Sequence, residues 1–270
     1  MRVAVLIVRH PASRPSPVVP EMLRGLARHG CAVDVVTPDE GLLDTAELRP
    51  EHDLYVLKSG TESALSLAGA LHHRGARIVN PYAVAAACRD KIVQTPVLQA
   101  AGVPVPQSWV CVDPATLAPL LDEGPLIVKD PRGSQGRGLT IARRPGDLEA
   151  LPPGRPRLAM RYHVPDGPDH KLYRIGDDVF GVQRAFPART YDQKLGRPFE
   201  VEPELRELVL RCGAAFGISL YGVDVVYSAG RPWVVDMSGF PGFKGVPDAG
   251  ARLADYLVTV GPAVAERAAS

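Results

Sequence analysis

The chain has 270 residues, of which 46% are hydrophobic and 23% are charged, and its formal net charge at pH 7 is +1. This composition is typical of a folded globular protein with two or three lobes and excludes an intrinsically disordered chain. The near-neutral charge argues against a nucleic-acid partner, because such partners are gathered by a strongly basic surface. We therefore expect a small-molecule partner.

The four cysteines, Cys31, Cys88, Cys111 and Cys212, are far apart in the sequence. They form neither a zinc-ligand spacing nor a disulfide framework, so we expect reduced thiols that are mostly buried. The apolar runs are far shorter than the ~20 residues that span a bilayer, and the N-terminus resembles no signal peptide. The sequence therefore predicts a cytoplasmic protein that does not bind membranes.

Strand and helix patterns alternate over the first 80 residues, which favours a small parallel α/β lobe. The expected strands cover residues 3–8, 32–37, 53–57 and 76–80, and the expected helices cover residues 20–29 and 61–74. One further helix is expected over residues 84–101, because Gly102 and the prolines after it end the helical pattern. We place the first lobe at residues 1–83.

After Pro106 the pattern changes to strands and hairpins, which predicts two α+β lobes. The second lobe, residues 84–150, has expected strands at 108–112, 125–129 and 139–142 and a short helix at 114–121. A stretch rich in proline and glycine, residues 145–156, is expected to separate it from the third lobe, residues 151–270. That lobe is predicted to hold hairpins at 170–184 and 222–237 and helices at 204–216 and 249–267.

The most informative segment is the expected hairpin at residues 222–237. If its turn centres on Gly230, Asp224 lies opposite Asp236 with the β-carbons about 5 Å apart. Ser238 projects to that same face. The other face is expected to be an apolar core surface, formed by Val223, Val225, Tyr227, Trp233, Val235 and Met237.

The two facing carboxylates predict a magnesium site. Carboxylates this close repel each other unless a cation lies between them. Oxygen-only ligands suit magnesium, which takes the rest of its shell from water and substrate phosphates. The alternative interpretation is a solvated hairpin face that tolerates two acids.

A glycine-rich loop joins two expected strands between Lys129 and Leu139, with glycines at positions 133, 136 and 138. Glycines let backbone amides approach an anion closely. Because the loop joins strand to strand, it is neither a Rossmann turn nor a Walker loop, both of which open a helix. We interpret it as a flap over phosphates with Lys129 beneath it, the alternative being a plain mobile hairpin.

The expected hairpin at residues 170–184 carries two cations on one face. A two-residue turn at Asp177 and Asp178 puts Lys171 opposite Arg184. Like charges directly opposed are unfavourable unless an anion bridges them, and a transferring phosphoryl group or an acyl phosphate would serve. The alternative is that both side chains extend outward into water. The rest of this face is expected to be apolar, with Tyr173, Ile175, Phe180 and Val182.

Taken in order along the chain, these motifs resemble ATP-grasp enzymes. The resemblance rests on residues 89–91, 101–106, 127–129, 133–138, 222–224 and 236–238, followed by residues 241–245. The nearest branches are the ribosomal-protein glutamate ligases and the inositol-phosphate kinases of the same fold. The resemblance implies an N-terminal α/β lobe followed by two α+β lobes that clamp a nucleotide.

The resemblance also implies ATP and one or two Mg²⁺ ions as cofactors. The ATP phosphates would be held by Lys91 and Lys129 under a flap formed by Gly133, Ser134, Gln135, Gly136 and Gly138. The adenine would lie against a hinge formed by Met160, Arg161, Tyr162 and His163, and the ribose within reach of Asp169. Magnesium would be held by Asp224, Asp236 and Ser238, although the family usually has asparagine at the last of these positions.

The function that we expect is carboxylate–amine ligation through an acyl phosphate, with Lys171 and Arg184 stabilising the developing charge. The substrates would be a small anionic molecule and an amine, with the anion near the basic residues Arg14, Lys58, Arg189, Lys194 and Lys244. One alternative is a small-molecule kinase of the inositol-phosphate kinase type. A second is a nucleotide-binding protein without turnover. The identity of both substrates and the formation of a homo-oligomer are left open.

Overall fold

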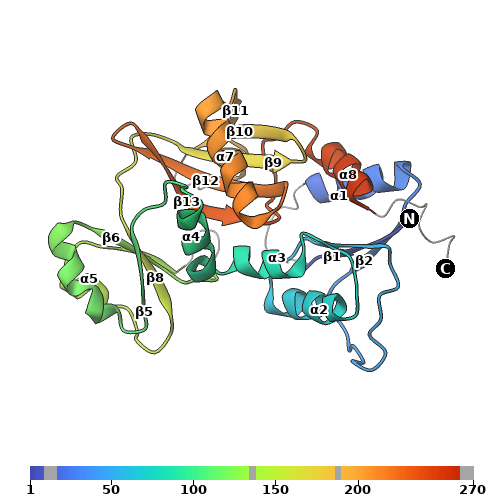
Figure 1. The fold of residues 1–270 in the computed structure, drawn as a ribbon, viewed down its shortest axis with the longest axis horizontal. Helices are drawn as coiled ribbons and strands as arrows, with labels where there is room; N and C mark the ends of the chain where they lie inside the picture. The colour runs from blue at the N-terminus through green and yellow to red at the C-terminus, as the bar shows by residue number, and fades with distance from the viewer. Residues whose placement is uncertain (9–16, 134–137, 186–189, 262–270) are drawn as a thin grey trace.

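Three separate sheets, each with its own helices, make up the fold (Figure 1). The structure is a computed structural model that describes residues 1–8, 17–133, 138–185 and 190–261, without the side chains of Tyr191 and Lys194. Figure 1 shows the N-terminal sheet at one end of the molecule and the small β5–β8 sheet at the other. No helix among the described residues is long and apolar enough to cross a bilayer.

The N-terminal lobe is a parallel four-stranded sheet in the order β2-β1-β3-β4. Its strands are β1 (Arg2–Leu6), β2 (Ala32–Val36), β3 (Leu54–Leu57) and β4 (Ile78–Val79), and its helices are α1 (Val18–Arg28) and α2 (Glu62–His73). All four residues of β3 are buried, as expected for a parallel strand that is covered on both faces. The sequence predicted this lobe to within about two residues at most element ends.

The single helix predicted over residues 84–101 is two helices, which corrects that prediction. These are α3 (Tyr82–Arg89) and α4 (Lys91–Ala100). Asp90 between them is extended, with φ −107° and ψ 109°, and its carboxylate accepts a hydrogen bond from the backbone N–H of Ile92. An aspartate in this role caps the second helix. Lys91 is therefore the first residue of α4.

The small lobe is an antiparallel sheet in the order β5-β8-β6-β7. Its strands are β5 (Ser108–Cys111), β6 (Leu126–Lys129), β7 (Leu139–Ala142) and β8 (Arg157–Arg161). The 3₁₀ helix η1 (Pro114–Glu123) and the short helix α5 (Pro145–Glu149) accompany it. Because β8 pairs with both β5 and β6, the boundary predicted after residue 150 falls inside this sheet, and the small lobe extends to residue 161.

The large lobe is an antiparallel sheet in the order β11-β10-β9-β12-β13. Its strands are β9 (Asp169–Ile175), β10 (Asp178–Arg184), β11 (Arg197–Phe199), β12 (Leu220–Ser228) and β13 (Arg231–Ser238). Its helices are α6 (Tyr191–Leu195), α7 (Pro203–Phe216) and α8 (Ala249–Val260). The predicted extension of the last helix to residue 267 lies outside the described residues from position 262 onwards.

The two faces of the large sheet bury different cores. One face packs against α7 and α4, in a cluster that includes Val223, Val225, Met237 and Cys212. The other face joins β1, α1 and α8 in a second cluster, which takes in Tyr173, Ile175, Val182 and Leu220. Figure 1 shows α8 lying beside α1, so the end of the chain ties the large lobe to the N-terminal lobe. All four cysteines are free and buried, as predicted.

The register predicted for the first hairpin was wrong by two residues. Asp178 pairs with Ile175, so the turn residues are Gly176 and Asp177, and Gly176 supplies the positive φ of 63°. Lys171 therefore lies opposite Val182, and Arg184 opposite Asp169, instead of facing each other. A shift of two residues keeps every side chain on its predicted face. The apolar face was accordingly predicted correctly, with Tyr173, Ile175 and Val182 buried.

The second hairpin confirms the predicted pairing of Asp224 with Asp236, although its turn is different. Ser228 pairs with Arg231 around Ala229 and Gly230, whose φ angles of 50° and 70° are those of a two-residue hairpin turn. A bulge between Asp224 and Val225 shifts the pairing by one residue, so the predicted register holds from Gly222 to Asp224. Between the bulge and the turn, the core-facing residues of β13 therefore differ from those predicted. Val234 is buried in the core, whereas Val235 and Trp233, which were predicted to be there, are not.

Candidate active site

Two cations from neighbouring strands converge on one carboxylate. Lys171 Nζ lies 2.8 Å from Asp224 Oδ2, and Arg184 Nη2 lies 3.0 Å from Asp224 Oδ1. The Lys171 side chain is only 7% exposed, so this pair is well shielded from water. The prediction that an anion bridges the two cations is therefore met by a protein carboxylate, and no substrate group is needed for it.

Two further lysines, from the small-lobe side, reach the neighbouring strand β13. Lys91 Nζ lies 3.4 Å from Asp236 Oδ1 and donates a hydrogen bond to Gly133 O at 3.0 Å. Lys129 Nζ, at the end of β6, donates to Val235 O at 3.1 Å. The two lysines that were predicted to hold phosphates thus lie beside the two carboxylates that were predicted to hold metal.

The electrostatic balance of this face is positive. Four cations, Lys91, Lys129, Lys171 and Arg184, face the two carboxylates of Asp224 and Asp236. Burial lowers the pKa of Lys129, although the charge of Asp236 opposes this shift. Burial, helped by the charge of Asp224, raises the pKa of the third acid, Asp169, to about 6. A face with more positive than negative charge attracts polyanions such as nucleotide phosphates.

The donor set fits magnesium that is bound together with phosphates. Asp224, Asp236 and Ser238 offer only oxygen atoms on one face of β12 and β13, and Gly222 lies opposite Ser238. Both oxygens of Asp224 already contact cations, and the described residues contain no cluster of three His, Cys, Asp or Glu side chains that could hold a metal. A divalent ion would therefore need phosphate oxygens to complete its shell.

Gln94 fixes the strand that carries Asp236, and no sequence motif had singled it out. It lies on α4, is 2% exposed, and pairs with both backbone groups of Met237. Gln94 Oε1 accepts from Met237 N at 3.0 Å, and Gln94 Nε2 donates to Met237 O at 2.7 Å and to Cys88 O at 2.9 Å. Met237 lies between Asp236 and Ser238, so this amide sets the position of both predicted metal ligands.

Asn80 makes a second such tie from the N-terminal lobe. Its Nδ2 donates to Leu220 O at 2.7 Å and to Gly239 O at 2.5 Å, and its side chain is buried. These two carbonyls belong to the start of β12 and to the residue that follows β13. The only sequence signal for either set of contacts is an amide side chain, Asn80 or Gln94, within an otherwise apolar segment.

The base of the glycine-rich loop makes close contacts with the small lobe, while its tip, which includes Ser134, Gln135 and Gly136, lies outside the described residues. Gly138 has φ 70°, and a β-carbon there would lie 2.3 Å from Asp130 Oδ2. Asp130 Oδ1 in turn lies 3.0 Å from Arg157 Nη1. Gly133 accepts the hydrogen bond from Lys91, so both ends of the loop are anchored beside the charged face.

The predicted adenine hinge begins with the last two residues of β8 and continues beyond the strand. Met160 is buried, and Arg161 turns to the small lobe, where Nη1 donates to Leu120 O and Gly124 O. Tyr162 N donates to Pro125 O at 2.9 Å. His163 stacks on Trp233 with ring centroids 4.1 Å apart, which links the hinge to β13. Adenine binding by this segment and ribose binding by Asp169 stay predictions.

Of the five basic residues expected near the substrate, Lys58 and Lys244 lie close enough to act on each other electrostatically. Lys58 Nζ donates to Phe240 O at 3.2 Å. Arg14, Arg189 and the side chain of Lys194 lie outside the described residues. All five were expected near one anionic substrate, and that expectation stays a prediction.

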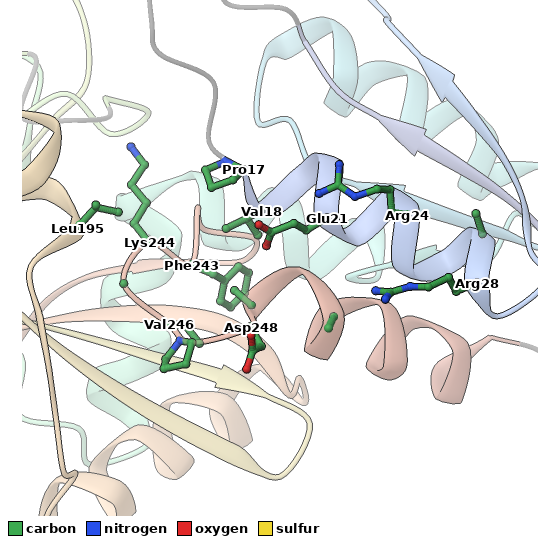
Figure 2. A pocket seen from close by; sticks show the side chains of 15 residues that line it. Pro17, Val18, Glu21, Arg24, Arg28, Leu195, Phe243, Lys244, Val246 and Asp248 are labelled. Carbon is green, nitrogen blue, oxygen red and sulfur yellow. The ribbon is translucent and has the colours of Figure 1, made fainter.

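A cavity of about 900 Å³ lies between α1 and α8, away from the charged face. Figure 2 shows Lys244 and Leu195 at one end of it and Arg28 at the other. None of the predicted nucleotide or metal residues lines this cavity. Of the expected substrate residues whose side chains the structure describes, Lys58 and Lys244, only Lys244 lines this cavity.

Solved structures define the class of the fold. A RimK domain ATP-grasp protein from Sphaerobacter thermophilus matches 95% of this chain and 99% of its own, with TM-score 0.75 and 22% identity. The ATP-grasp ligase PsnB, in a structure with a minimal precursor variant, Mg and ADP, matches 95% and 97% with TM-score 0.66 and 18% identity. These identities establish the fold alone: this is an ATP-grasp fold, as the sequence predicted.

The particular family follows from the sequence comparison. The family model of the RimK-like ATP-grasp domain matches residues 88–260, more than half of the chain, and the chain belongs to this family. A probable alpha-L-glutamate ligase from Stenotrophomonas maltophilia (strain K279a) is 28% identical over 187 residues. That match covers 64% of this chain and 64% of the relative, just under two thirds of its length.

Proposed function

We propose that this protein is an ATP-dependent carboxylate–amine ligase that forms an amide bond on a small acidic substrate. The observation that carries the proposal is the pairing of Asp224 with Asp236 beneath Lys91 and Lys129. Family membership supports it, because the relative and the PsnB protein described above are both named as ligases.

The proposed chemistry has two displacement steps. A carboxylate oxygen of the substrate attacks the γ-phosphorus of ATP, and ADP leaves. The amine nitrogen then attacks the acyl carbon, inorganic phosphate leaves, and the amine gives up a proton. Bound magnesium would neutralise phosphate charge, held by oxygens of Asp224, Asp236 and Ser238.

The residues of the chain contribute position and charge. Lys91 and Lys129 would bind the transferring phosphate, and the Lys171–Asp224–Arg184 cluster would keep the metal carboxylate in place. Lys171 and Arg184 were predicted to touch the reacting group. Their contacts with Asp224 favour a positioning role, in which they hold the carboxylate that faces the metal.

The test is ADP release with a panel of carboxylic acids and amines, followed by phosphorus NMR of the products. A ligase releases one inorganic phosphate with each ADP and requires the amine. A phosphorylated product that forms without amine would establish the kinase alternative instead. Nucleotide binding without ADP release for any acid would leave a binding protein, and the Asp236→Ala variant supplies the inactive control.

A further inference from the structure

The chain enters the small lobe once and leaves it once. The entering segment, residues 101–107, joins α4 to β5, and the leaving segment, residues 162–168, joins β8 to β9. The entering segment is bonded to β13 of the large sheet, where Val234 N donates to Pro104 O at 2.8 Å. The leaving segment is bonded to the same hairpin, closer to its turn.

Asp166 holds the leaving segment on the turn between β12 and β13. Its backbone N–H donates to Tyr227 O at 2.8 Å, and its two carboxylate oxygens accept from Ala229 N at 3.0 Å and from Gly230 N at 2.9 Å. Hydrogen bonds from backbone N–H groups to a carboxylate are stronger than those between neutral groups. One residue of the segment is therefore bonded to the hairpin at three points.

His163 holds the same segment nearer to the small lobe. Its ring lies almost parallel to the ring of Trp233, at an interplanar angle of 15°, and the guanidinium of Arg231 lies 5.3 Å from the centre of the Trp233 ring. The preceding residue belongs to the other side, because Tyr162 N donates to Pro125 O in the small lobe. The lobes therefore meet between two consecutive residues, one held by each lobe.

Trp233 lies on the face of the large sheet that carries the two carboxylates. Its neighbour Val234 is buried in the core on the other face, so alternation directs Trp233 to the face of Asp224 and Asp236. Trp233 precedes Asp236 by three residues, which corresponds to about 10 Å along β13 at ~3.3 Å per residue. The stacked rings are therefore on the charged face but beyond the reach of a phosphate bound at Asp236.

The packing around β13 gives a bound nucleotide its direction. Past Ser238 the chain is packed into the fold, because Gly239 O accepts from the buried side chain of Asn80 and Phe243 is 0% exposed. A nucleotide with its phosphates beside Lys129 therefore extends its sugar and base the other way, toward the stacked rings.

We infer that His163, Asp166 and Trp233 form a clip that positions the nucleoside end of the ATP site. This inference rests on the proposed ATP-dependent function and adds positioning residues to it. The clip holds the backbone of the leaving segment at a fixed place relative to the phosphates beside Lys129. A nucleotide then finds the sites for its base and its phosphates already arranged, whereas a loosened segment has to be ordered on binding at a cost in affinity.

The test compares ADP with inorganic tripolyphosphate, each with Mg²⁺, by calorimetry on the full chain. Tripolyphosphate offers phosphates without a sugar or a base, so it reports on the phosphate end alone. We expect Trp233→Leu to weaken ADP binding about five- to tenfold and to leave tripolyphosphate binding within about twofold of wild type. Trp233→Phe keeps an aromatic ring against His163 and should retain most of the ADP affinity.

A second pair of variants tests the carboxylate of the clip. Asp166→Ala removes both acceptors of the turn and should weaken ADP binding by about fivefold, whereas Asp166→Asn keeps one acceptor oxygen and should lose less. The matched control is Tyr221→Phe, which removes a buried hydrogen bond of 2.6 Å to Val209 O in the same lobe. It should lower the melting temperature and leave the affinities for both ligands unchanged.

Three results would overturn the inference. Equal weakening of ADP and tripolyphosphate in Trp233→Leu would show that the stacked rings support the whole fold and have no particular role at the nucleoside end. Unchanged ADP binding in Trp233→Leu would remove the clip, and so would a wild-type protein that binds ADP no more tightly than tripolyphosphate. The ligase proposal fails separately, if no acid and amine give ADP release, and that result leaves the contrast between the two ligands intact.

Discussion

Two groups of positive charge meet the large sheet, and they differ in how the protein balances them. Lys171 and Arg184 share the carboxylate of Asp224 at 2.8 and 3.0 Å. Lys58 has the carbonyl and ring of Phe240 as its contacts and Lys244 as its charged neighbour. The first group is balanced within the fold, whereas Lys58 forms no ion pair among the described residues.

The difference shows that a buried cation can either stabilise the fold or cost it stability, depending on whether a carboxylate lies beside it. A buried cation that is paired with a carboxylate is costly to disturb, because removing one partner leaves the other charge buried and alone. A cation without a carboxylate costs stability as it stands, and gains from any anion that binds. Substitutions in the two groups should therefore have opposite effects on stability.

The largest effect is expected for Asp224→Ala. This change leaves the buried Lys171 and the partly exposed Arg184 without their shared partner, so we expect a loss of about 3 kcal/mol in the free energy of unfolding. Denaturant unfolding followed by circular dichroism measures it. Turnover is lost as well, because the carboxylate that faces the metal is gone.

A double variant controls for this result. Lys171→Met combined with Asp224→Leu removes the buried charge pair together, and should recover part of the lost stability without any recovery of ADP release. If the double variant were as unstable as Asp224→Ala, the loss would come from packing, and the contrast between the two groups would lose its electrostatic basis.

Asp236→Ala is expected to separate activity from stability. Its side chain is 29% exposed and contacts Lys91 at 3.4 Å, so the free energy of unfolding should change by no more than about 1 kcal/mol. ADP release should fall by roughly 10²- to 10³-fold, since a charged group beside the transferring phosphate is removed. Unchanged activity would contradict the assignment of Asp236 to the metal.

Gln94→Leu tests the device that positions Asp236. Three backbone groups lose their partner, namely Met237 N, Met237 O and Cys88 O, and we expect the free energy of unfolding to fall by about 3 kcal/mol. The magnesium concentration for half-maximal ADP release should rise, which a change in packing alone would not produce. Gln94→Glu keeps the acceptor for Met237 N and should lose less stability.

The candidate site was predictable where its residues share a strand or a hairpin. Alternation along β12 and β13 placed Asp224, Asp236 and Ser238 on one face, and the observed pairing agrees. The predicted turn was one residue off, but the bulge compensates for this error, so the predicted pairing of Asp224 with Asp236 is correct. Nearer the turn the error remains, and Val234 is buried where Val235 was predicted to be. Bulges have no sequence signal of comparable strength, because the extra residue obeys no alternation.

The charge partners were harder to predict, because they depend on register and on neighbouring strands. Lys171 was assigned a partner within its own hairpin, but the strand beside it is also β12, which is distant in sequence and supplies Asp224. Alternation determines the face of a side chain, and it carries no information about which strand comes next in the sheet.

Contacts between lobes could not be predicted at all. Gln94 and Asn80 act on backbone groups more than 130 residues away, so only the folded chain brings them together. The split between α3 and α4 did have a signal, since Asp90 before Lys91 is a good helix cap, but the apolar pattern runs across it.

The smallest effect that we predict is the pH dependence of stability at Lys58. Burial lowers the pKa of this ammonium from 10.5 to about 8, so between pH 8 and about 10.5 the unfolded chain binds more protons than the folded one. The free energy of unfolding therefore gains from this residue as the pH rises through that window. The full shift corresponds to about 3 kcal/mol, and partial exposure of the side chain reduces the expected gain to roughly 1–2 kcal/mol.

The measurement is the difference in unfolding free energy between the wild-type protein and Lys58→Met at pH 7.5 and pH 10, without substrate. Met has no proton to lose, so the wild-type protein should be the less stable of the two at pH 7.5 and should approach the variant at pH 10. A wild-type advantage at pH 7.5 in the absence of any anion would mean that the fold itself balances Lys58, and the contrast with Lys171 would disappear.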